Sequence, residues 1–333
     1  MVEGSSHRTI QGRQTRKLTH MRNAGYFSLL CLTAACFGQE PHLDLPRDDS
    51  SGAETISFRL AECDDAPAEV ELKRFKKQAL QSVSFRGGGI FEFDRRELNS
   101  SFVDVGVGTG IPLGSFDNIL GVTPRFRVDW IDAASDIDVP EELYEFELQF
   151  FHRRPLRDRL SLLAIVSPSV RSDLTTSDRA FRVFALGLLN WECVPDRLTL
   201  SGGAVVLGRA DLPVLPALGV VWTPNRRTKL DLRFPLTRFS YRLAKNGGQS
   251  ETWAYLSGGI GGNTWAVTRE NDRTDELSLR DYRLVLGVER LVDGGGGCFA
   301  EFGVALGRRL EYERTDTEIS FDDAAIVRGG WRY

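Results

Sequence analysis

Residues 298–312 change character at every step, and this alternation restricts the fold more than any other feature of the sequence. The apolar members recur every second residue, with Arg308 as the one exception: Ala300, Phe302, Val304, Leu306, Leu310 and Tyr312. The residues between them are small or charged, such as Glu301 and Arg309. Because successive side chains of a β-strand point to opposite faces, the stretch predicts a strand with one apolar face. This pattern is typical of transmembrane β-barrels, whose strands turn apolar residues to lipid and polar residues to the lumen.

The same alternation recurs from Ser82 to Tyr333. Strands are expected at 83–94, 103–108, 122–130, 144–150, 159–171, 179–191, 198–208, 215–223, 228–236, 238–244, 252–267, 277–291, 299–312 and 325–333. Turn-forming groups such as Asn246-Gly247 separate many of them. We therefore predict an all-β fold, a transmembrane antiparallel up-and-down β-barrel of about 12–14 strands that occupies residues 82–333.

Composition fits this prediction without proving it. Hydrophobic residues make up 41% of the chain and the mean hydropathy is -0.23. An alternating strand averages to such values, so they suit a barrel as well as a soluble protein. A secreted β-sandwich or lipocalin-like barrel is therefore the competing prediction. Outside residues 24–38 no apolar stretch is long enough for a transmembrane helix. The net charge is -4 and no basic patch argues for nucleic acid, so we expect no nucleic-acid partner.

The first part of the chain predicts export. Residues 1–38 form the expected signal peptide, in which Arg22 precedes an apolar core from Ala24 to Ala35 and small residues follow. Met21 is a natural alternative start, and Cys36 loosely matches a lipidation site. Residues 39–81 form an expected polar linker, which either includes a short helix over 67–80 or continues without one.

Charged residues on the polar phase of the strands are the candidate functional residues. The expected lumen-lining residues are Arg125, Arg127, Glu145, Glu147, Asp231, Arg233, Arg283, Glu289, Glu301, Arg309 and Arg328. Lys229, Asp281, Glu311 and Arg332 share their phase. Charges there require a wet or mutually paired interior. Two interpretations remain open: a narrow porin-like channel for small solutes, and a closed structural or surface-interaction barrel whose lumen is bridged by Arg–carboxylate pairs.

Aromatic residues provide a second indication of a membrane setting. Those near expected strand ends are Trp130, Trp191, Trp222, Trp253, Trp265, Tyr312, Trp331 and Tyr333. Tryptophan and tyrosine favour the membrane–water interface, where an apolar ring keeps its polar group wet. They are therefore expected to form an interfacial belt.

Little in the sequence supports catalysis. Of four histidines only His152 lies in the barrel region, and no nucleophile motif accompanies it. No cluster has the spacing of metal ligands. We expect no enzyme activity and no cofactor or metal, with an outer-membrane enzyme as a minor alternative. Cys193 and Cys298 lie near expected turns, and a disulfide between them is left open.

The carboxy-terminal third resembles a family of uncharacterised outer-membrane β-barrel proteins of Gram-negative-type bacteria. The residues that carry the resemblance lie at 219–224, 230–235, 253–255, 258–265 and 281–289, and it continues through Phe302-Gly303 to 330–333. The resemblance implies an outer-membrane location, a lipid environment and a barrel, and it implies no activity. It also implies that Trp331 and Tyr333 act as the signal that the barrel-assembly machinery reads. A monomer is the favoured state.

Overall fold

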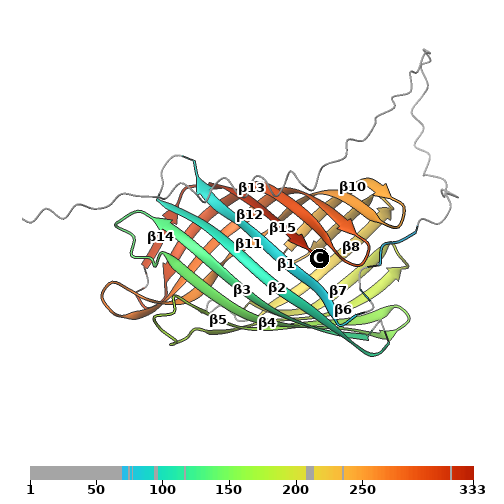
Figure 1. Cartoon of the computed structure of the whole chain (residues 1–333), viewed down its shortest axis with the longest axis horizontal. Helices are drawn as coiled ribbons and strands as arrows, with labels where there is room; N and C mark the ends of the chain where they lie inside the picture. Colours follow the sequence, from blue (N-terminus) through green and yellow to red (C-terminus); the bar gives the residue numbers. More distant parts are fainter. Residues whose placement is uncertain are drawn as a thin grey trace, which may run out of the picture. The chain divides into compact units, whose positions relative to one another are not determined.

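The computed structural model describes residues 70–73, 76, 78–93, 97–115, 118–207, 214–234, 236–315 and 317–333. These residues form fifteen β-strands (Figure 1). The strands are β1 (Leu80–Glu92), β2 (Leu98–Ser115), β3 (Asn118–Ala133), β4 (Glu142–Arg157), β5 (Leu160–Ser172), β6 (Phe181–Val194), β7 (Leu198–Val206), β8 (Leu215–Asn225), β9 (Thr228–Arg233), β10 (Leu236–Asn246), β11 (Ser250–Thr268), β12 (Thr274–Val292), β13 (Gly297–Tyr312), β14 (Thr317–Phe321) and β15 (Ala324–Arg332). No helix within these residues is long and apolar enough to cross a membrane.

The sheet closes on itself. Each strand from β1 to β13 pairs antiparallel with the next, and β15 pairs with both β13 and β1. Because β14 and β15 follow each other along β13, they make up one wall strand, and the barrel has fourteen. The closure joins the first strand to the last, and just beyond β15 the amide of Tyr333 donates to the carbonyl of Val83 in β1 at 2.8 Å. The predicted fold is confirmed, and the alternative of two stacked sheets is wrong.

The outer face of the barrel is apolar, as the alternation predicted. Outward side chains along β4 are Phe146, Leu148 and Phe150, and those along β12 include Leu284 and Leu286. All of them are solvent-exposed on the isolated chain. Such a wall of exposed apolar residues is what a lipid-facing surface requires.

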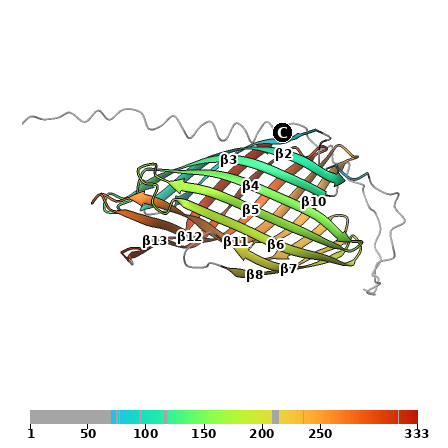
Figure 2. The same ribbon diagram turned by 90° about the horizontal axis from the view of Figure 1, so that it is seen from below.

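The two ends of the barrel differ in their connections. At the end that holds Tyr333, which we call the short-turn end, β4 and β5 are joined by two residues and β8 and β9 likewise. At the opposite end, which we call the loop end, eight residues join β3 to β4 and another eight join β5 to β6. Figure 2 shows the tilted strands running between these two ends.

A row of irregularities crosses β11 to β15 near the loop end. Gly262 of β11 has a φ of 95° and pairs with Arg280. The register between β12 and β13 shifts just beyond Arg280, opposite Gly307, whose φ is 56°. Asp322 and Asp323 interrupt the wall strand beside it, and Asp323 accepts a hydrogen bond from the amide of Gly307. Beyond this row, the tips of these strands leave the regular wall.

The segment before β1 runs along the short-turn end. Its described residues, 70–73, 76 and 78–79, are not helical, so the short helix over 67–80 is not formed there. Asp293 of the β12–β13 turn accepts a hydrogen bond from the amide of Lys73, and the Lys76 ammonium lies 3.5 Å from the centre of the Tyr333 ring. The predicted signal peptide and most of the predicted linker lie outside the described residues.

Candidate functional site

The inner face of the barrel is lined by ion pairs. On β1 to β4 they centre on Asp104, which is 1% exposed and accepts from Arg86 at 2.8 Å and from Arg125 at 2.6 Å. Arg125 also reaches Glu147 on β4 at 3.0 Å. Four charges of alternating sign therefore bridge four adjacent strands. Each carboxylate compensates the cost of bringing an arginine into the barrel.

A second network joins β10 to β15. The Glu301 carboxylate pairs with Arg328 at 2.8 Å and accepts a hydrogen bond from the Tyr255 hydroxyl at 2.8 Å. Arg238 stacks over the Tyr255 ring at 3.6 Å and pairs with Glu289 at 2.6 Å. The four charged groups form two opposite-sign pairs, so this part of the lumen is electrically balanced.

Three further pairs form between residues two apart on one strand. Arg127 binds Asp129, Arg233 binds Asp231, and Arg283 binds Asp281 through two nitrogens each. Residues two apart share a face of a strand, so their side chains meet without help from another element. A cavity of about 100 Å³ is lined by two of these pairs, Arg127–Asp129 and Arg283–Asp281, and by Arg328.

The structure places the expected lumen residues on the inner face, with Arg309 as the exception. Arg309 faces outward, with its side chain 55% exposed, and pairs with Glu318 of β14 at 3.0 Å. Glu311 also faces outward and pairs with Arg280 at 2.6 Å. The cause is the irregularity at Gly307, where β13 contains one residue more than the facing part of β12. Beyond this point, every side chain of β13 therefore points to the opposite face from the one that the alternation predicts. Arg308, the apparent exception in the sequence pattern, is thereby the residue that points inward.

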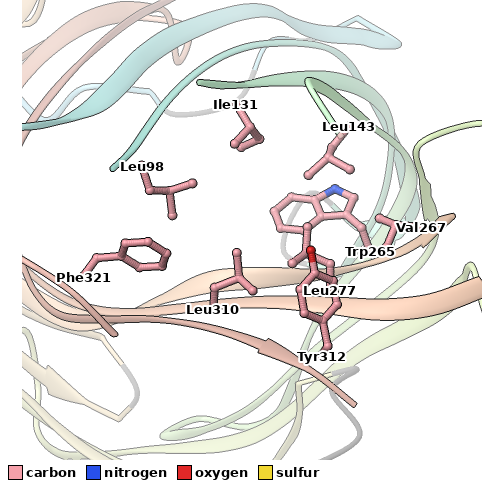
Figure 3. Close-up of a cluster of buried hydrophobic side chains, with 9 residues drawn as sticks. All are labelled: Leu98, Ile131, Leu143, Trp265, Val267, Leu277, Leu310, Tyr312 and Phe321. Atoms are coloured by element: carbon pink, nitrogen blue, oxygen red, sulfur yellow. The ribbon is translucent and has the colours of Figure 1, made fainter. Parts of the chain in front are cut away.

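The same reversal buries apolar residues that the pattern assigned to lipid. Leu310 and Tyr312 are 0% and 2% exposed. On β11, Trp265 lies just beyond the irregularity at Gly262 and is 3% exposed. They form one cluster across the loop end with residues of the opposite wall, as Figure 3 shows: Leu98, Ile131, Leu143, Trp265, Val267, Leu277, Leu310, Tyr312 and Phe321. We call this set the loop-end cluster.

The predicted aromatic belt is therefore only partly correct. Trp265 and Tyr312 belong to the loop-end cluster, and Trp253 lies on the inner face, where its indole donates to Glu251 at 2.9 Å. The remaining residues of the predicted belt are exposed: Trp130, Trp191, Trp222, Trp331 and Tyr333. Trp191, Trp222, Trp331 and Tyr333 lie at the short-turn end, and Trp130 lies at the loop end. The role of Trp331 and Tyr333 in assembly stays a prediction.

The tip of the β11–β12 hairpin reaches across the barrel to β5. Ala266 bridges Ser172 in parallel, although five strands separate β11 from β5 around the wall. Both faces of this tip are buried, since Ala266 and Val267 are each 0% exposed. We call residues 263–279 the inward tip. The inward tip therefore bridges the interior of the barrel at the loop end.

Ion pairs hold the inward tip in place. Glu276 is 3% exposed and binds Arg182 of β6 and, at 2.8 Å, Arg179 of the β5–β6 connection. The hydrogen bond to Glu276, followed by charge attraction, raises the pKa of Arg179. Asp173 accepts a hydrogen bond from the amide of Thr268 at 2.7 Å. On the other side, Arg269 binds Asp138 of the β3–β4 connection at 2.7 Å.

Sequence reasoning missed the residues that hold this tip. Arg182 and Glu276 are 94 positions apart, and no local spacing signals their contact. Arg308 was visible as a break in the alternation, and it binds Glu92 at 2.5 Å. A charged residue at an apolar position, next to Gly307, was the one available sign of the reversal.

The cysteines and the histidine of the described residues do not form a site together. Cys193 on β6 and Cys298 on β13 are not linked to each other. Within the described ranges, no three His, Cys, Asp or Glu side chains are arranged to hold a metal ion. His152 lies on the outer face of β4, away from the lumen networks.

The fold and the inner face define a closed antiparallel β-barrel with an apolar exterior and an ion-paired lumen. The chain belongs to the family described as Domain of unknown function (DUF6268), whose model matches residues 132–322. No curated protein matches the chain.

Among solved structures, the chain is similar to mutants of the porin of Rhodopseudomonas blastica. Two of them are 10% and 9% identical to it, with TM-scores of 0.27 and 0.28. A triple mutant is 10% identical, with a TM-score of 0.27. In each comparison, 76% of this chain and 100% of the porin chain are covered.

Proposed function

We propose that this protein is an integral β-barrel of a bacterial outer membrane, reached by export, and that its lumen is closed in this conformation. The membrane setting is supported by the continuous apolar outer face together with charged residues inside. In lipid every backbone polar group needs a partner, and a closed barrel supplies one for each. The protein then acts as a structural or surface-interaction barrel through its loops, without catalysis.

The loop-end cluster is the observation that supports the proposed closed lumen most directly. It joins β2, β3 and β4 to β11, β12, β13 and β14 through side chains that exclude water. Ion pairs line the inner face below it and carry charges of both signs. Solutes moving through would have to break apolar contacts and charge pairs together, which a permanently open porin does not require.

Conductance tests the closed state directly. The refolded barrel, inserted in planar lipid bilayers, is expected to carry no steady ionic current at low voltage. Heat-modifiable migration in gels and resistance to protease establish that the inserted protein is folded. A stable current through the folded wild-type barrel contradicts the proposal and favours the porin-like channel.

A gated channel is the second candidate, and the row of irregularities at Gly262, Arg280 and Gly307 favours it. Backbone irregularities on three adjacent strands at one level form a line about which the inward tip can turn. Glu276 is the residue through which the tip is held to Arg179 and Arg182. Breaking this contact is therefore the appropriate test.

The variant Glu276→Gln is expected to produce current steps at voltages where the wild type is silent. The change removes the charge that binds two arginines and leaves the buried Arg182 uncompensated, which weakens the closed position. Glu318→Gln is the matched control, because it removes an exposed carboxylate that pairs with Arg309 on the outer face. Silence of Glu276→Gln in bilayers, with folding intact, argues for a permanently closed barrel.

A further inference from the structure

The β4–β5 hairpin ends in a concentration of arginine at the short-turn end. Arg153, Arg154, Arg157 and Arg159 lie within seven residues, accompanied by a single acid, Asp158. All four arginines are exposed. Within the part of the chain that the structure describes, none of them forms an ion pair, whereas the arginines of the lumen do. We call residues 153–159 the basic tip.

The basic tip begins where the apolar outer face ends. Along β4 the outward side chains are Phe146, Leu148 and Phe150, followed by His152 and Arg154. A membrane strand changes from apolar to charged residues at the level of the lipid headgroups.

An aromatic residue marks the same level on the neighbouring strand. Trp191 of β6 pairs with Leu160, immediately after the basic tip, and its side chain is 54% exposed. Within the tip Leu156 is 44% exposed, so apolar surface is available for the acyl region beside the arginines. Exposed arginine, leucine and tryptophan at one level are the combination that an interfacial surface uses.

Two connections at the loop end are acidic. The β3–β4 connection carries Asp136, Asp138 and Glu141 and no basic residue. The β5–β6 connection adds Asp173 and Asp178 against Arg179. These two connections therefore have no counterpart of the basic tip, and the whole chain has a net charge of -4.

We propose that the basic tip binds the phosphate groups of anionic phospholipids in the leaflet at the short-turn end. Guanidinium groups match phosphate oxygens with paired hydrogen bonds. Several arginines near an anionic surface add their attractions within a Debye length. Leu156 and Trp191 hold the tip at headgroup depth. The inference rests on the proposed membrane setting, and the test separates the two.

Trp191 is a natural reporter for lipid beside the basic tip. In the reporter protein, the other outward tryptophans, Trp130, Trp222 and Trp331, are replaced by phenylalanine. Trp253 and Trp265 are kept, because they face inward, beyond the reach of lipid. The barrel is inserted in vesicles of phosphatidylcholine containing a minor fraction of phosphatidylglycerol. Bromine is carried by one lipid or the other, and tryptophan fluorescence is measured.

Brominated phosphatidylglycerol is expected to quench Trp191 several-fold more than its share of the lipid predicts. High salt and the variant Arg154→Gln/Arg157→Gln/Arg159→Gln are each expected to remove this excess. A second reporter that keeps Trp130 in place of Trp191 provides the control, since it lies at the acidic loop end and should show no excess.

Quenching of Trp191 in proportion to the bulk lipid, with the barrel inserted, overturns the proposal. So does an excess that survives the triple arginine substitution. If neither brominated lipid quenches Trp191 although the barrel is folded, the membrane setting itself is wrong and the lipid site falls with it.

Discussion

The variant Leu286→Arg is expected to lower the free energy of unfolding in lipid vesicles by about 2–4 kcal/mol. Leu286 lies on the outer face of β12, and its side chain is 61% exposed on the isolated chain. Its partners across the sheet are Leu256 and Phe302, which are also exposed. An arginine here has to carry its charge into hydrocarbon or draw water and headgroups toward itself. Denaturant unfolding of the vesicle-inserted barrel measures this cost.

Leu174→Arg is the matched control for Leu286→Arg. Leu174 is equally exposed, at 62%, but it lies in the β5–β6 connection at the loop end. A charge there meets water, so we expect a change of less than about 0.5 kcal/mol. Equal effects of the two substitutions would contradict a lipid-facing wall, because a soluble barrel would accept arginine at both exposed positions.

The variant Trp265→Ala is expected to destabilise the barrel by about 3–5 kcal/mol. Trp265 is 3% exposed and contributes the largest ring of the loop-end cluster, between the inward tip and the opposite wall. Removing it leaves a cavity and takes away part of the apolar contact that closes the lumen. Unfolding experiments measure the first effect, and bilayer currents absent from the wild type measure the second.

Trp130→Ala is the control for Trp265→Ala, since Trp130 is 41% exposed and faces away from the lumen. It is expected to cost less stability and to produce no current. If Trp265→Ala stays fully silent in bilayers while it unfolds more easily, the cluster stabilises the barrel without sealing it.

Alternation predicts most of this fold, because apolar residues at every second position place all of them on the same face of a strand. The outward side of Phe302 follows from it. Arg309 escaped prediction because one additional residue near Gly307 reverses every side chain beyond it. Alternation predicts which residues share a face. Only a break in the alternation indicates where the side chains switch between the inner and the outer face.

The ion pairs of the lumen also divide into those that the sequence predicts and those that it does not. Asp281 and Arg283 stand two apart on one strand, so their pairing is local and readable in the sequence. Glu276 and Arg182 are in contact only because the ends of β11 and β12 extend across the barrel interior to β5 and β6. The sequence does not show whether an apolar residue such as Leu310 faces lipid or a closed interior. That distinction depends on the three-dimensional path of the strand.

The bend at Gly307 also decides how thick a bilayer this wall can match. β13 contains sixteen residues, which is longer than a tilted strand needs to cross the hydrocarbon. In the proposed membrane setting its lipid-compatible face ends at Leu306, and residues 297–306, tilted as barrel strands are, would span about 25 Å along the membrane normal. In that setting the remaining residues of β13 lie beyond the hydrocarbon, at the loop end. Shortening or lengthening this wall before Gly307, by two residues at a time, would therefore suit the protein to a thinner or thicker membrane while leaving its closure unchanged.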